Sequence, residues 1–87
     1  MSVEEIIAYV QSQYIEPARK RGEKQVTIRA GDIHDEMKLR NCQPNVCETL
    51  RGRRLLEHCN IRLADERWGR NVHQHNARNI WYTYEIL

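Results

Sequence analysis

The stretch from residue 26 to residue 56 constrains the fold of this chain more than any other part of its sequence. It opens with a short run, residues 26–30, in which apolar and polar side chains alternate with the period of a half-buried strand. Two compact patterns with helical spacing follow, and the polar residues 38–43 separate them. We therefore expect a strand that leads directly into two short helices joined by a turn.

Another helix is expected before this strand. Ser2 followed three residues later by Glu5 is the signature of a capping box. Apolar residues then recur on one face at helical spacing, namely Val3, Ile6, Ile7, Val10 and Tyr14. Pro17 interrupts this pattern, so the helix either kinks there or restarts with Glu16 as its cap, and it stops at Gly22.

The two helices after the strand have recognisable starts. The first begins near Gly31 or Asp32, with Asp32 as the candidate cap, and places Ile33 and Met37 toward the core. The second covers residues 44–53, since a proline suits the first turn of a helix. Its expected inward residues are Val46, Cys47 and Leu50, with Leu55 and Leu56 closing the core beyond Gly52. Its expected outward residues are Gln43, Asn45, Glu48, Thr49, Arg51 and Gly52, followed by Arg53 and Arg54.

Two alternating runs near the end of the chain predict a hairpin of strands at residues 60–67 and 79–86. The segment between them, residues 69–78, is longer than the usual two-to-five-residue hairpin loop. Long loops in compact domains are usually functional or mobile. This one carries no acidic residue, and its charged or ionisable side chains are Arg70, His73, His75 and Arg78.

The resulting order of elements is helix, strand, helix, turn, helix, strand, long loop, strand. This order resembles the winged helix-turn-helix superfamily, in its small prokaryotic form, over residues 3–86. The resemblance implies an α+β fold in which a three-helix bundle packs on a small three-stranded antiparallel sheet. A chain of 87 residues forms one domain with a modest core, so we assign residues 1–87 to a single domain.

Charge is distributed unevenly along the chain. Residues 38–78 contain nine Lys and Arg against four acidic residues, whereas the remaining residues contain five basic and eight acidic ones. The half that holds the two later helices and the long loop is therefore expected to attract polyanions.

The sequence predicts double-stranded DNA as the partner, in a transcription regulator or in an accessory module of a DNA-processing system. The resemblance implies that helix 44–53 enters the major groove and that the loop contacts the backbone or minor groove. Asn and Gln can pair with adenine, Arg with guanine or phosphate, and Thr with the thymine methyl. The candidate contacts are Arg40, Gln43, Asn45, Thr49, Arg51, Arg53, Arg70, His73, His75 and Arg78.

Three alternatives stay open at this point. Winged helices also bind proteins, and an exposed Glu48 would suit a protein partner better than phosphate. Trp68, Trp81 and Tyr82 could stack on the bases of single-stranded nucleic acid or RNA. A homodimer could form through apolar residues of the first helix, namely Ile7, Tyr9 and Ile15.

Other functional classes find little support. The odd number of cysteines and the lack of an apolar leader indicate an intracellular, cytoplasmic protein, and no apolar run is long enough for a membrane span. The spacing of Cys42, Cys47, His58 and Cys59 matches no common zinc motif. No phosphate-binding loop or catalytic constellation is evident either. We therefore expect no enzyme activity, no metal and no cofactor.

Overall fold

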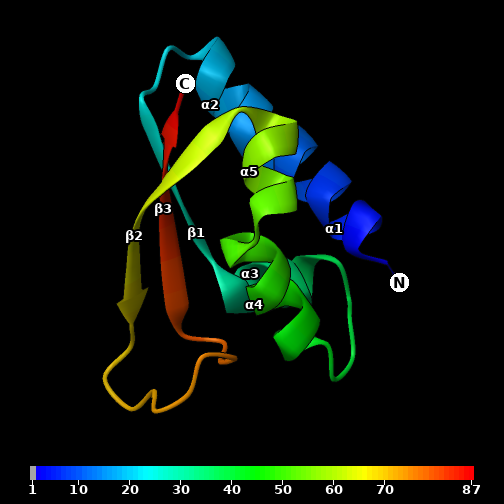
Figure 1. Ribbon diagram of the computed structural model, residues 1–87. Coiled ribbons are helices and arrows are strands. Elements are labelled where there is room, and N and C mark those ends of the chain that lie inside the picture. Colours follow the sequence, from blue (N-terminus) through cyan, green and yellow to red (C-terminus); the bar gives the residue numbers. More distant parts are fainter. Residues whose placement is uncertain (1) are drawn as a thin grey trace.

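The computed structural model describes residues 2–87 and is an α+β fold, in which helices cover one face of a three-stranded antiparallel sheet (Figure 1). The elements in chain order are α1 (Val3–Val10), the π-helix η1 (Gln11–Ile15), α2 (Glu16–Lys20), β1 (Gln25–Arg29), α3 (Ala30–Glu36), α4 (Gln43–Arg51), α5 (Arg53–Cys59), β2 (Ile61–Trp68) and β3 (Ile80–Ile86). No helix among these residues is both long and apolar enough to cross a membrane.

The sheet has the order β1-β3-β2, so the last strand of the chain lies in the middle. Both pairings are antiparallel, as expected, but β1 pairs with β3 alone and not with β2. Ile28 pairs with Tyr82, and Leu63 pairs with Tyr84 on the other side of the same strand. A bulge between Leu63 and Asp65 shifts the register of β2 as it runs toward the β2–β3 loop, residues 69–79.

The first helical arm is continuous from Val3 to Lys20 and contains a π-helical turn. Its capping box is confirmed, because the Ser2 hydroxyl accepts a hydrogen bond from the Glu5 backbone N–H. The Glu16 N–H donates to the Gln11 carbonyl, five residues back. Pro17 follows this wider turn directly, where its ring meets less crowding than it would in a regular α-helix. The helix then stops before Gly22, as predicted.

Helix α3 begins earlier than expected. Ala30, predicted as the last strand residue, is the first residue of the helix, and Arg29 occupies the cap position. Asp32 does not cap the helix, since it lies within the first turn and pairs with Arg29. The strand was predicted one residue too long. Ala30 is fully buried, as an inward-facing strand residue would be, but it belongs to the helix.

The predicted helix 44–53 corresponds to α4, but it is followed by a further helix, α5, that was not predicted. α4 ends at Arg51, Gly52 has an extended backbone, and α5 then carries Leu55 and Leu56. The prediction of a three-helix bundle with one helix directly before β2 is therefore wrong. Gly52 allows the break, because a Cβ at this position would lie 2.8 Å from the Glu48 carbonyl oxygen.

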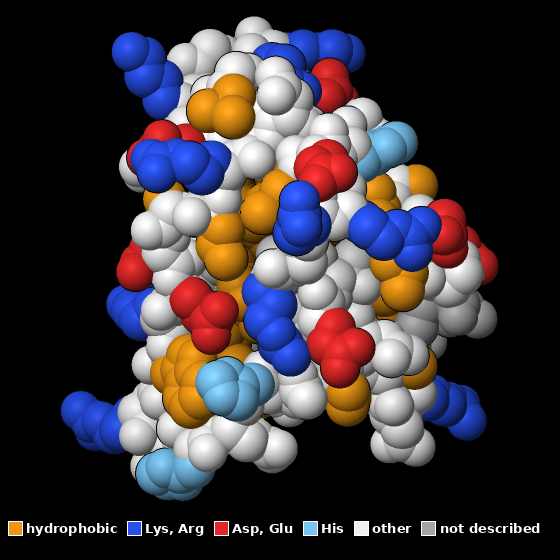
Figure 2. All heavy atoms as spheres, viewed as in Figure 1, with side chains coloured by type: hydrophobic (Ala, Val, Ile, Leu, Met, Phe, Trp, Pro, Cys, Tyr) orange, Lys and Arg blue, Asp and Glu red, His pale blue; other side chains and the backbone are white. Residues whose placement is uncertain are grey.

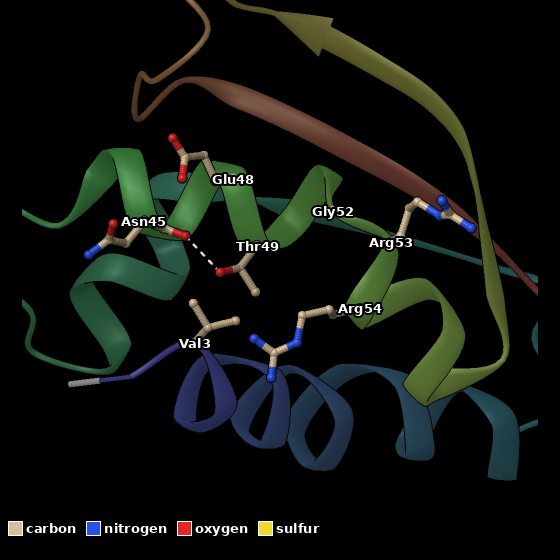
Figure 3. Close-up of a pocket in the computed structure, with 7 residues that line it drawn as sticks. All are labelled: Val3, Asn45, Glu48, Thr49, Gly52, Arg53 and Arg54. Atoms are coloured by element: carbon tan, nitrogen blue, oxygen red, sulfur yellow. Dashed lines mark hydrogen bonds between the residues drawn. The ribbon is translucent and has the colours of Figure 1, made fainter.

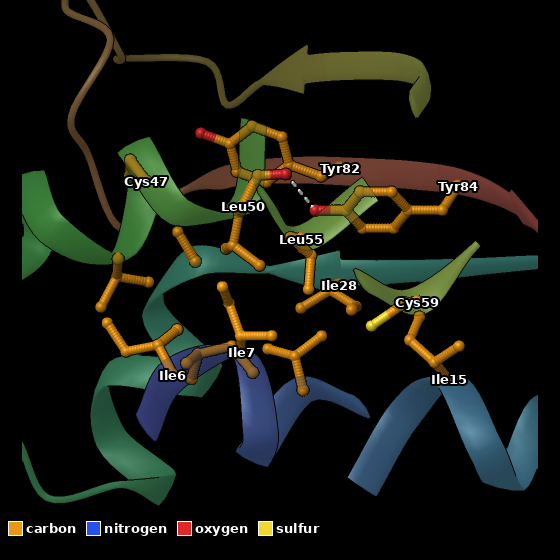
Figure 4. Close-up of a cluster of buried hydrophobic side chains, with 14 of the residues drawn as sticks. Ile6, Ile7, Ile15, Ile28, Cys47, Leu50, Leu55, Cys59, Tyr82 and Tyr84 are labelled. Atoms are coloured by element: carbon orange, nitrogen blue, oxygen red, sulfur yellow. Dashed lines mark hydrogen bonds between the residues drawn. The ribbon is translucent and has the colours of Figure 1, made fainter. Parts of the chain in front are cut away.

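The core lies between the helices and the sheet (Figure 4). Ile6 and Ile15 enter it from the first helical arm, and Leu50 enters it from α4. Tyr82 and Tyr84 of the central strand are fully buried. The Tyr84 hydroxyl donates to the Leu50 carbonyl, and this hydrogen bond joins the sheet to α4. The core therefore fixes α4 against the sheet and leaves its other side to solvent.

Candidate nucleic-acid interface

The exposed side of α4 is narrower than the sequence indicated. Asn45 and Glu48 are exposed, but the Thr49 residue is only 5% exposed and its hydroxyl donates to the Asn45 carbonyl at 2.7 Å. Figure 3 shows Thr49 directed toward Val3 and α1, whereas Glu48 points away from them. The expected outward position of Thr49 is therefore wrong, because the start of α1 covers that side of the helix.

Gln43, the first residue of α4, does not present its amide to solvent. Its Nε2 and Oε1 are both buried and have no hydrogen-bond partner among residues 2–87. The side chain lines an open hollow of about 370 Å³ together with His34, Asn41, Pro44 and Arg78. The expected outward position of this amide is wrong, since the side chain packs between the α3–α4 loop and the β2–β3 loop.

Arg51 holds the β2–β3 loop against α4. Its Nη1 donates to the His75 carbonyl and its Nη2 donates to the Asn76 side-chain oxygen, both at 3.0 Å. These two bonds use the guanidinium donors that were predicted to contact DNA. Arg51 therefore positions the loop in the free protein.

Arg78 connects the end of the same loop to α3. Its two terminal nitrogens donate to the two carboxylate oxygens of Asp35, at 2.8 and 2.6 Å. This pairing lowers the pKa of Asp35 and raises the pKa of Arg78, chiefly through the hydrogen bonds. The Arg78 carbonyl also accepts a hydrogen bond from the Gly31 N–H at 2.9 Å. The charge of Arg78 is thus largely neutralised within the molecule.

The middle of the β2–β3 loop is open to solvent. Arg70, His73 and His75 are all exposed. The His75 ring meets Trp68 edge-on, with ring centroids 5.0 Å apart, so the indole anchors one side of the loop. Arg70 forms no ion pair with any residue from 2 to 87.

The basic residues that follow α4 are paired with carboxylates. Arg53 lies 3.6 Å from Glu57, although its side chain is 91% exposed, and Arg54 pairs with Glu4 of α1. Figure 2 accordingly shows basic and acidic side chains interleaved over this face of the molecule. The excess of positive charge counted along the sequence does not produce a continuous basic surface here.

The α3–α4 loop, residues 37–42, carries two cations that differ from Arg53 in their lack of a carboxylate partner. Lys38 and Arg40 are exposed, and within residues 2–87 neither forms an ion pair. Lys38 and Asn41 both have positive φ angles, 55° and 53°, which shape this tight connection. Arg40 was a predicted contact, but Lys38 was missed. The sequence did offer an indication of it, because Lys38 lies two residues before Arg40 in the same polar segment.

Across residues 2–87 no group of three or more His, Cys, Asp and Glu side chains is placed to hold a metal ion.

Comparison of the chain with protein-family models, with curated proteins and with solved structures gives no match.

Proposed function

We propose that this chain is a winged-helix domain that binds double-stranded DNA, with α4 in the major groove and the β2–β3 loop as the wing. The order of the elements and the central position of β3 in the sheet support this assignment. The added α5 lies between α4 and β2 and is compatible with it. The outer side of α4 offers polar side chains that could face base edges, as a recognition helix requires.

The position of the unpaired cations carries the proposal. Lys38 and Arg40 lie in the loop before α4, and Arg70 lies in the β2–β3 loop. Figure 1 places these two loops at the same end of the molecule, with α4 between them. Cations on both sides of an exposed helix can contact the phosphates that border a groove while the helix enters it.

The strength of binding follows from the number of free charges. Three phosphate contacts give a modest, salt-dependent affinity, in the range of about 1 to 100 μM for non-specific duplex at physiological salt. The arginines already paired with carboxylates add less, since a phosphate must compete with an existing partner.

Fluorescence anisotropy with random-sequence duplex, single-stranded DNA and duplex RNA, at low and near-physiological salt, tests the proposal. We expect duplex DNA to bind most tightly and salt to weaken that binding. Arg70→Ala should weaken it on all duplexes alike. Arg62→Ala, which removes an arginine paired with Glu85 on the sheet, is the matched control and should change little. Absence of duplex binding at low salt, or equal effects of the two substitutions, would overturn the proposal.

A protein-binding module is the second candidate. The observation that favours it is the unpaired carboxylate of Glu48, which lies between the cationic loops and would repel phosphate. A protein partner with basic and acidic groups would satisfy this mixed surface. The same titration separates the two functions, because a protein module would show no duplex binding at low salt.

A further inference from the structure

The outer side of α4 contains very few side chains that could recognise a base. Gln43 is turned inward, Thr49 is buried and Arg51 is bonded to the β2–β3 loop. The polar side chains of the helix that are exposed are those of Asn45 and Glu48. If α4 enters the major groove, these two side chains are the ones available to contact base edges.

Glu48 has no internal role that would account for it. Its carboxylate forms no ion pair with any residue from 2 to 87, and Arg51, three residues later, is bonded to the β2–β3 loop instead. Figure 3 shows the side chain directed away from the neighbouring helices. An unpaired carboxylate near DNA is unfavourable unless a donor on the DNA meets it.

The major groove offers such a donor most cleanly at cytosine. A carboxylate only accepts hydrogen bonds, and cytosine presents its N4 amino group without an adjacent acceptor on the same base. Adenine also has an amino group, but the N7 acceptor beside it would repel the carboxylate. Guanine and thymine present acceptors at the corresponding positions. Of the four bases, cytosine is therefore the best match for a carboxylate in the major groove.

Asn45 has the complementary chemistry for adenine, because its amide both donates and accepts and so matches N7 and N6. It lies three residues before Glu48, on the same side of α4. Three residues of α-helix rise about 4.5 Å, and stacked bases are about 3.4 Å apart. The two side chains therefore reach neighbouring base pairs when the helix follows the groove.

We infer that α4 recognises a C·G pair next to an A·T pair, with Glu48 accepting from the cytosine amino group and Asn45 pairing with adenine. This inference rests on the proposed function. It also gives Glu48 a role in specificity, because its carboxylate weakens binding to every sequence that lacks the cytosine. Negative charge at this position excludes wrong sites as well as favouring the right one.

The experiment is selection of preferred sites from a random duplex pool by the wild-type chain and four variants. Glu48→Ala, Glu48→Gln and Asn45→Ala change exposed side chains and should fold normally. Glu57→Ala is the matched control, since it removes an exposed carboxylate from α5. Thermal unfolding confirms that each variant is folded before selection.

We expect the wild type to enrich a C·G pair beside an A·T pair. Glu48→Ala should lose the cytosine preference alone, by about 5- to 150-fold, and should bind unrelated duplexes as tightly or more tightly. Glu48→Gln should shift that position toward adenine, since an amide matches N7 and N6. Asn45→Ala should lose only the adenine preference, and Glu57→Ala should keep both.

The results separate failure of this inference from failure of the proposed function. Duplex binding without enrichment of the C·G and A·T pair, or the same selected site with Glu48→Ala, overturns the inference and leaves the proposed function standing. A wild-type chain that binds no duplex overturns both.

Discussion

At the scale of single residues, the arginines show how one chemistry serves two purposes. Arg51 and Arg78 were predicted to bind phosphate because a guanidinium offers paired donors to oxygen atoms. In the folded chain those donors meet a carbonyl, a side-chain amide and the carboxylate of Asp35. The identity of a residue fixes what it can bind, but only the fold decides which partner is within reach.

Arg51→Ala tests the role of that side chain in holding the β2–β3 loop. The substitution removes two charge-assisted hydrogen bonds from a half-buried side chain, so we expect a loss of about 1 to 3 kcal/mol in the free energy of unfolding. Urea denaturation measures it. Arg53→Ala is the control, since that side chain is 91% exposed, and should change stability by less than about 0.5 kcal/mol. Equal stability of both variants would contradict the role of Arg51.

The pair of Asp35 and Arg78 predicts an effect of acid. The hydrogen bonds from Arg78 lower the pKa of Asp35 in the folded chain below its ordinary value of 3.8. The pair therefore stabilises the fold above about pH 4, and this stabilisation is lost as the pH falls through the lowered pKa. Between pH 5 and pH 2 we expect the wild type to lose more stability than Asp35→Asn, measured by urea denaturation. Parallel curves for the two proteins would remove the pair as a source of pH dependence.

At the scale of helices and strands, the periodicity of apolar residues predicted which elements form better than it predicted where they begin and end. The strand alternations, the capping box at Ser2 and the helical stripe of the first arm all express local rules, and each is present in the fold. The end of α4 at Arg51 was missed because Gly52 tolerates both a helix and a break, and the close approach to the Glu48 carbonyl is invisible in the sequence. Thr49 was misplaced because its cover comes from α1, which is distant along the chain.

The break between α4 and α5 gives a prediction of its own. A Cβ at Gly52 would lie 2.8 Å from the Glu48 carbonyl oxygen, so Gly52→Ala should destabilise the fold by about 1 to 3 kcal/mol. Gly31→Ala is the matched control, since its Cβ would lie 3.1 Å from the Arg29 guanidinium, the end of a long side chain that can shift by a few tenths of an ångström while it stays paired with Asp32. We expect that variant to be neutral or more stable by up to about 1 kcal/mol, because alanine favours the helix. Denaturation curves that rank the two variants in the opposite order would contradict this account.

At the scale of the whole molecule, the charge count along the chain overestimated the basic surface. The partners of Arg54, Arg62 and Arg78 are Glu4, Glu85 and Asp35, which belong to other elements of the fold. A count over residues 38–78 could not include those carboxylates, because all three lie outside that range. The field that a polyanion meets is therefore set mainly by the exposed cations that lack such partners.

The salt dependence of duplex binding measures how many cations act. With Lys38, Arg40 and Arg70 each neutralising one phosphate, the slope of log K against log salt should be about −2.7. Arg70→Ala should reduce its magnitude by about one unit. Replacing Asp35 and Arg78 together by alanine removes a neutral pair, so the slope should not change. A loss of one unit in that double variant would mean that Arg78 leaves Asp35 for a phosphate, and the β2–β3 loop would then rearrange when DNA binds.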